Sequence, residues 1–264
     1  MKYFVPLALL AACTLRAAEP AQHIDVGKLP QQATLVEDVI VPVPSEVFGV
    51  LDKLGSPNWH DVLRSVKGEP PGARPQTALL LGSVIAEGFI AVEAQESEEV
   101  KKIGREVLNL SKAIGVEKAV VSRSKAIIEF ADKKDWMRVR RELDGALADV
   151  KQAMSELHDE ELAQLVSLGG WLRGTEALTQ VVKKNYTKDS AELLHQPSLL
   201  EYFNRRIKGM NGRLKGDGAV AKIEKRLPEI RPLIGEANSV ISAKSVDQIN
   251  EITGDLVKTI SAKE

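Results

Sequence analysis

The sequence predicts an all-α fold, a compact bundle of about seven to ten helices behind an extended N-terminal segment. Hydrophobic residues make up 44% of the 264 residues but aromatic residues only 4%. A core of Ala, Leu, Val and Ile suits helix packing, because strands favour aromatic and β-branched side chains. From residue 75 onward, apolar residues recur at helical spacing between caps and stops. No internal repeat or long heptad pattern interrupts this reading.

The first 18 residues resemble a signal peptide, so we expect the protein to be exported. Lys2 provides a positive start, residues 4–15 are apolar, and Ala17 and Ala18 follow. An apolar stretch of this length is too short for a stable membrane-spanning helix. Removing Lys2 and Arg16 from the 36 basic residues leaves 34 against 37 acidic ones, a mature net charge of −3.

Residues 10–13, Leu-Ala-Ala-Cys, offer an alternative ending for this signal. They resemble the signal of bacterial lipoproteins, whose cysteine is lipidated and becomes the mature N-terminus. Both endings remain open, with Cys13 as the lipidation residue in the second. Cys13 is the only cysteine, so the mature chain has no disulfide and its stability must come from packing.

Residues 19–44 form a predicted flexible or extended tether, and residues 45–264 a single α-helical domain. Four prolines punctuate the tether, and residues 39–41, with Val43, favour a short extended stretch. We expect a helix start at Ser45 and a second short helix after Ser56, with Pro57 in its first turn.

Nine further helices are expected. Ser97 should cap the second and Gly115 end it, Pro228 and Pro232 should kink or split the eighth, and Ser245 should cap the ninth. The first and fifth should be the central pair. Their expected ranges are 75–95, 97–115, 117–132, 134–157, 159–185, 189–195, 197–215, 219–237 and 245–261.

The segment 76–94 is long enough to raise the question of a membrane span. Only Glu87 and Glu93 are charged within it, but Glu87 would lie near the bilayer centre. An acid there costs roughly 2.5–3.5 kcal/mol on insertion scales. We therefore predict a core helix and no transmembrane helix in the mature chain.

No recognisable catalytic motif is present, and we expect neither a cofactor nor a metal site. Phosphate loops, paired metal-binding histidines and nucleophile elbows are all missing from the sequence. His158 precedes three acids, Asp159, Glu160 and Glu161, which resembles a metal cluster. Acids at the start of a helix also complement its dipole, and we prefer that interpretation. We therefore do not favour an enzymatic function.

Two small-residue stripes predict a close contact between the central helices. Gly170 and Gly174 are four residues apart, and each glycine destabilises a helix by roughly 1 kcal/mol relative to alanine. Close approach of a neighbouring helix would offset this, and Gly82 with Ala86 on the 75–95 helix supplies a matching surface.

The same two helices carry isolated charges. Arg173 and Glu176 are the only charged residues between Glu161 and Lys183, and Glu87 lies in the other helix. An unpaired buried charge is prohibitive, so we predict that Arg173 pairs with Glu87. The group is interpreted as fixing helix register, with a polar site for a small anionic ligand as the alternative.

A basic segment near the C-terminus is the last candidate. The segment from Glu201 to Arg231 contains nine basic residues and four acidic ones. In an exported protein such a segment can contact an anionic lipid or cell-wall polymer, whereas nucleic acid is excluded by compartment and overall charge. A solvated helix face with internal ion pairs is the simpler interpretation. The residues proposed for this contact are Arg205, Arg206, Lys208, Arg213 and Lys215.

These observations together predict a protein of the bacterial periplasm or outer membrane that binds or interacts with an unknown protein or envelope component. Two alternatives remain. One is a lipid-anchored structural protein, and the other is an envelope enzyme with an unrecognised site around Glu87 and Arg173.

Overall fold

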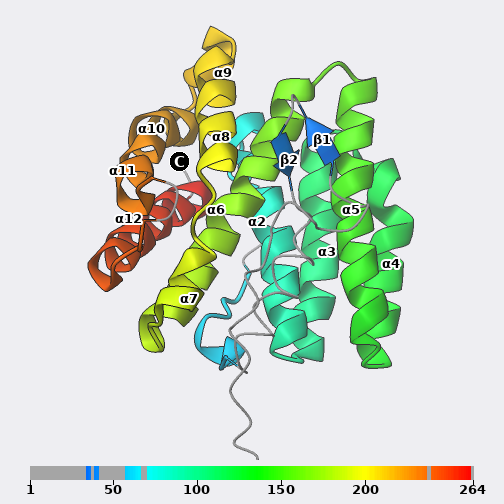
Figure 1. Cartoon of the computed structure of the whole chain (residues 1–264). Helices are drawn as coiled ribbons and strands as arrows, with labels where there is room; N and C mark the ends of the chain where they lie inside the picture. The colour runs from blue at the N-terminus through cyan, green and yellow to red at the C-terminus, as the bar shows by residue number, and fades with distance from the viewer. Residues whose placement is uncertain (1–33, 37–38, 42–56, 67–69, 237–238, 263–264) are drawn as a thin grey trace, which may run out of the picture.

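The computed structural model describes residues 34–36, 39–41, 57–66, 70–236 and 239–262. The predicted signal segment with Cys13, most of the tether and the helix expected after Ser45 lie outside the described residues. Two short strands, β1 (Thr34–Val36) and β2 (Val39–Val41), pair antiparallel. β2 is the extended stretch expected at 39–41. Apart from this hairpin, the described residues contain only helices, turns and loops, which confirms the predicted all-α bundle (Figure 1).

Four helices form an up-and-down arrangement in the first half of the bundle. They are α2 (Arg74–Glu93), α3 (Ser97–Ala113), α4 (Glu117–Asp132) and α5 (Trp136–Glu156). Each packs against the next, and α5 returns to α2. Closure of this ring encloses one apolar core, as in other four-helix bundles.

Helix α6 (Glu160–Lys184) makes the most extensive helix contact with α2, and α12 (Ala243–Ser261) packs against α6. The predicted central pair is therefore confirmed. Eight α-helices of nine or more residues lie within the described segments, inside the predicted range, and α7, α9 and α11 are shorter. The remaining elements are the 3₁₀ helices η3 (Trp59–Asp61) and η4 (Leu227–Ile230), with α7 (Lys188–Glu192), α8 (Pro197–Gly209), α9 (Gly212–Lys215), α10 (Gly218–Arg226) and α11 (Arg231–Ile234).

Helix α2 is the core of the molecule. Seventeen of its 20 residues are buried, as expected for a helix that is apolar on every side. It is long and apolar enough to cross a membrane, but 94% of its most apolar 18-residue window is buried by the rest of the chain. Its place in the structure is that of a core helix.

The structure corrects three predicted helix starts. The short helix expected after Ser56 is only the 3₁₀ turn η3. Ser97 does not cap α3, because the N-cap position is Glu96, without a side-chain hydrogen bond. The last helix is capped by Ser242 rather than Ser245, since the Ser242 hydroxyl accepts a hydrogen bond from the Ser245 amide at 3.1 Å.

Two predicted helices are broken within the C-terminal half. The helix expected over 197–215 divides between α8 and α9, where the Asn211 side chain caps α9. The helix expected over 219–237 splits into α10, η4 and α11, as Pro228 and Pro232 predict.

The four turns that join α2 to α6 share one backbone design. Each has a residue of positive φ, namely Gln95, Gly115, Lys134 and His158. In each, the next residue donates its amide to a carbonyl five residues back, as Val116 does to Ser111 at 2.9 Å. This is the Schellman motif, and the accepting helix ends immediately before the next begins. Gly115 is the helix stop that the sequence predicts.

Replacing Gly115 with alanine is expected to lower the free energy of unfolding by about 1 kcal/mol, because an L-residue is strained at this φ of 88°. Nothing lies within 4 Å of the new methyl group, so the effect is confined to the backbone. The matched change Lys134→Gly should stabilise by roughly 0.5 kcal/mol. Urea unfolding followed by circular dichroism measures both, and a neutral Gly115→Ala variant would contradict this turn geometry.

Candidate functional site

Three charged side chains are buried between α2 and α6. Glu87 comes from the middle of α2, and Arg173 and Glu176 come from one turn of α6. The side chains of Arg173, Glu176 and Glu87 are only 1%, 2% and 4% exposed. Charged side chains are almost never buried to this extent unless they are paired.

Arg173 lies at the centre of the group, and its predicted pairing with Glu87 is present. The Arg173 Nε donates to Glu87 Oε2 at 2.6 Å. Its Nη1 lies 3.4 Å from Glu176 Oε2, and its Nη2 donates to the Val62 carbonyl oxygen at 2.5 Å. The guanidinium therefore joins α2, α6 and the segment 57–66.

A second arginine completes the network, and sequence reasoning missed it. The backbone amide of Arg64 donates to Glu87 Oε1 at 2.6 Å, and its guanidinium pairs with Glu176 Oε1. Arg64 is 37% exposed, so the network reaches the surface on this side. The only signal for it was a lone arginine in a segment without strong helical periodicity.

Helix α12 is tied to the same turn of α6. Asn250 Nδ2 donates to Thr179 Oγ1 at 2.9 Å and approaches the Glu176 carbonyl oxygen at 3.3 Å. Gln180 Nε2 donates to Glu176 Oε1 at 3.2 Å. Glu176 thus connects the segment 57–66, α6 and α12 through hydrogen bonds and ion pairs.

Burial raises the pKa of the Glu176 carboxyl, and this desolvation outweighs the attraction of Arg173 and Arg64, which lowers the pKa. A carboxyl with a raised pKa is also a mark of catalytic sites. Such an acid must reach a substrate in a cleft, however, and the Glu176 side chain is only 2% exposed.

The internal contacts leave little chemical capacity for a ligand. Both oxygens of Glu87, both oxygens of Glu176 and three guanidinium nitrogens of Arg173 have protein partners. Each nitrogen of the guanidinium is engaged and the Arg173 side chain is only 1% exposed, so an anion from solvent does not reach it. The arrangement is that of a buried polar network whose members are paired with one another.

Glycines bring the two central helices into direct backbone contact beside this network. A methyl group on Gly82 would lie 1.8 Å from the Val166 carbonyl oxygen, and one on Gly169 would lie 1.9 Å from the Leu79 carbonyl oxygen. Gly170 faces the Gly82 carbonyl oxygen at 3.3 Å on the same measure. Arg74 at the start of α2 pairs with Asp159 at the start of α6, and Glu87 further along α2 pairs with Arg173 further along α6, so the two helices run parallel.

The predicted glycine contact is therefore present but shifted. Gly82 of α2 and Gly170 of α6 face each other as predicted, and Ala86 of α2 is buried. Gly174 does not belong to the contact, because nothing lies within 4 Å of a methyl group built there. Gly169, which we did not single out, takes its place. The contact follows positions 166, 169 and 170, one helical face at spacings of three and four.

The basic residues near the C-terminus divide into paired and unpaired groups. Lys215 pairs with Glu224 at 3.0 Å, and Arg206 lies over the Tyr202 ring at 5.4 Å. Arg205, Lys208 and Arg213 are exposed, and none forms an ion pair with another described residue. The segment thus keeps some uncompensated positive charge, less than its composition suggests.

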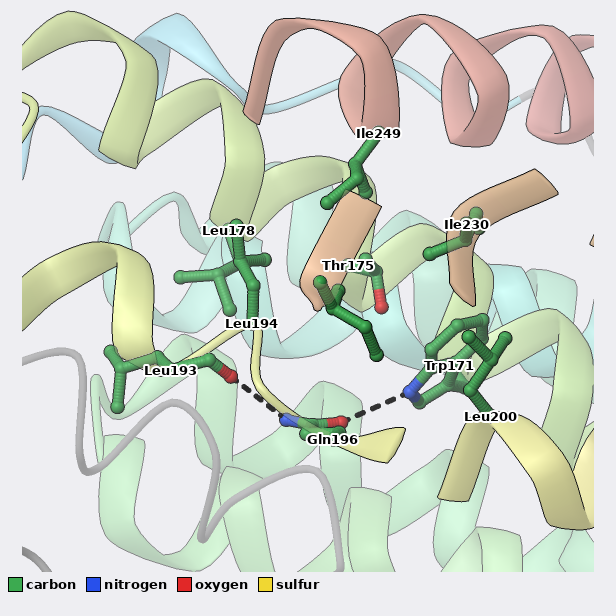
Figure 2. A pocket seen from close by; sticks show the side chains of 10 residues that line it. Trp171, Thr175, Leu178, Leu193, Leu194, Gln196, Leu200, Ile230 and Ile249 are labelled. Carbon is green, nitrogen blue, oxygen red and sulfur yellow. Dashed lines mark hydrogen bonds between the residues drawn. The ribbon is translucent and has the colours of Figure 1, made fainter. Parts of the chain in front are cut away.

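An apolar pocket lies where α6 meets α12, η4 and the turn before α8 (Figure 2). Trp171 lines it, packs against Phe203 with ring centroids 5.5 Å apart, and donates its indole N–H to Gln196 Oε1 at 3.1 Å. Its internal void is only about 10 Å³, which holds at most one water molecule. Trp171 is therefore a packing residue.

Histidines and acids do not gather into a metal site within the described segments. No three His, Cys, Asp or Glu side chains there lie close enough together to hold a metal ion. His60 is 3.3 Å from Glu96, and His195 is 3.2 Å from Glu192. His158 and the acids after it instead line a surface cleft.

No known protein family, curated protein or solved structure matches this chain.

Proposed function

We propose that this protein is an exported, non-enzymatic binding or interaction module of the bacterial cell envelope, in the periplasm or at the outer membrane. Export is supported by Lys2, the short apolar stretch 4–15 and the small residues that follow. The interaction role is supported by a helical scaffold whose interior charges are paired with one another.

The observation that carries this proposal is the internal satisfaction of the Glu87–Arg173–Glu176 network. A catalytic group must present a free donor, acceptor or nucleophile to a substrate. Here the carboxylate oxygens and guanidinium nitrogens already have protein partners. The enzyme alternative around Glu87 and Arg173 is therefore less well supported than a binding role.

The lipoprotein-like residues 10–13 also allow a lipid-anchored form of the protein. Lipidation of Cys13 would hold the helical domain at a membrane through the proline-containing tether. In that form the protein would still act through the surface of its helical domain, so the interaction role does not depend on which signal ending is used.

Mass spectrometry of the mature N-terminus, after expression and cell fractionation, tests this proposal. We expect a processed chain in the envelope fraction, beginning either at a free Ala18 or Glu19 or at a lipidated Cys13. The variant Cys13→Ala separates these endings, because it removes the lipid without affecting ordinary cleavage. An intact N-terminus at Met1 in the cytoplasm would refute export.

Co-purification from the native envelope, with identification of bound proteins and small molecules, tests the interaction role. We expect a specific partner that remains bound to variants of the buried network that still fold. Turnover of a bound molecule, lost in Arg173→Lys at unchanged stability, would favour the enzyme alternative.

A further inference from the structure

A surface cleft of about 590 Å³ lies at the end of the bundle where α2 and α6 begin. One wall is formed by the first residues of these two helices, and the other by α9 and the turn into α10. The volume is in the range of small-molecule sites, about 300–1,000 Å³. It lies away from the buried network, because neither Glu87 nor Arg173 lines it.

The cleft is acidic. Four carboxylates line it, against the two guanidiniums of Arg74 and Arg213, which leaves a formal charge of −2 with His158 neutral. The N-termini of α2 and α6 add a partial positive charge of about 0.5 each, so the cleft remains negative. The four acids are Asp159, Glu160, Glu161 and Asp217.

Two of these acids are already engaged. Asp159 pairs with Arg74 at 2.8 Å, and Glu161 accepts a hydrogen bond from the Asn211 amide at 2.9 Å. Glu160 is exposed and has no hydrogen-bond or ion-pair partner among the described residues. Its carboxylate is available to a ligand.

Asp217 gives the second, independent indication of a ligand. It is only 9% exposed, and its Oδ1 accepts hydrogen bonds from the amides of Ala219 and Val220 at 2.9 and 3.1 Å. Its Oδ2 is buried and has no hydrogen-bond partner. A buried acceptor left in this state costs about 1–3 kcal/mol, so a donor supplied at the cleft would be stabilising.

The composition of the lining selects the type of cation. The acids of the cleft are not close enough together to form a metal site. Apolar groups of Pro75, Leu162 and Leu214 lie among them in the lining. Carboxylates that do not converge on one point, in a lining that also holds apolar groups, match a chain of methylene groups that carries an ammonium group at each end.

We propose that this cleft binds an aliphatic polyamine, with its ammonium groups at Glu160 and Asp217 and its methylene groups over Leu214. This inference deepens the proposed binding role and rests on it. It needs only the purified protein for its test, so its outcome is separate from that of the export and partner experiments.

Isothermal titration calorimetry with spermidine at low salt tests the site. We expect saturable binding to one site, and Glu160→Gln and Asp217→Asn should each weaken it about tenfold. Asparagine is also a good N-cap, so Asp217→Asn should preserve the start of α10, which thermal unfolding verifies.

The matched control is Glu117→Gln. Glu117 lies in the first turn of α4, so it shares the helix N-terminal setting, but it does not line the cleft. Its affinity for spermidine should equal that of the parent protein. Absence of saturable binding, equal weakening by Glu117→Gln, or displacement of spermidine by an equal charge concentration of Mg²⁺ would each overturn the proposal.

Discussion

The variant Arg173→Met is expected to lower the free energy of unfolding by about 3–5 kcal/mol, the largest effect we expect of any single substitution. The change leaves Glu87 buried without its closest cation and removes the donor to the Val62 carbonyl. Methionine fills much of the same volume, so the loss is electrostatic rather than a cavity effect. Urea unfolding monitored by circular dichroism measures it.

The control for this prediction is Lys183→Met on the same helix. Lys183 pairs with Asp247 at 2.8 Å, but the two side chains are 54% and 52% exposed. Exposed pairs contribute at most about 1 kcal/mol, so this variant should be nearly neutral. Equal effects from the two variants would mean that burial does not set the strength of the Arg173 contacts.

The second large effect is expected from Gly82→Ala or Gly169→Ala, each of which should destabilise the protein by about 3 kcal/mol. The new methyl group would lie less than 2 Å from a backbone carbonyl oxygen of the facing helix. Backbone cannot move aside like the end of a flexible side chain, so α2 and α6 must separate. The separation would also lengthen the Arg173–Glu87 contact.

Gly174→Ala on the same helix is the matched control. No atom lies within 4 Å of the added methyl group, and alanine favours a helix interior by up to about 1 kcal/mol over glycine. This variant should therefore be neutral or stabilising. Thermal unfolding of the three variants separates the close helix contact from helix propensity. Destabilisation by Gly174→Ala equal to that by Gly82→Ala would contradict the contact geometry.

The helices were predictable because their sequence signals are local. The central ion pair was predictable because each buried charge has few other possible partners. Periodic apolar residues between breakers place α2 and α6 within one residue or two of their observed ends. A lone acid in one apolar helix and a lone arginine in another have few alternatives to pairing when both are buried.

The exact helix face and the loop contacts were not predictable from the same information. Gly169, Gly170 and Gly174 fit more than one face of a helix, and only the crossing of α2 against α6 selects positions 166, 169 and 170. Arg64 reaches Glu176 from a loop 112 residues earlier in the chain, so no periodic pattern links them. Likewise, Ser242 and Ser245 both have capping chemistry, and backbone geometry decides between them.

The measurement that tests the central claim most directly is the unfolding free energy of the double variant Glu87→Leu/Arg173→Met. A double-mutant cycle compares it with the unfolding free energies of the unmodified protein and of the two single variants. If the buried charges serve to hold α2 and α6 in register, the double variant should be markedly more stable than Arg173→Met alone, because the stranded carboxylate is gone. Damage that simply adds between the two substitutions would show that Glu87 and Arg173 do not depend on each other inside the fold.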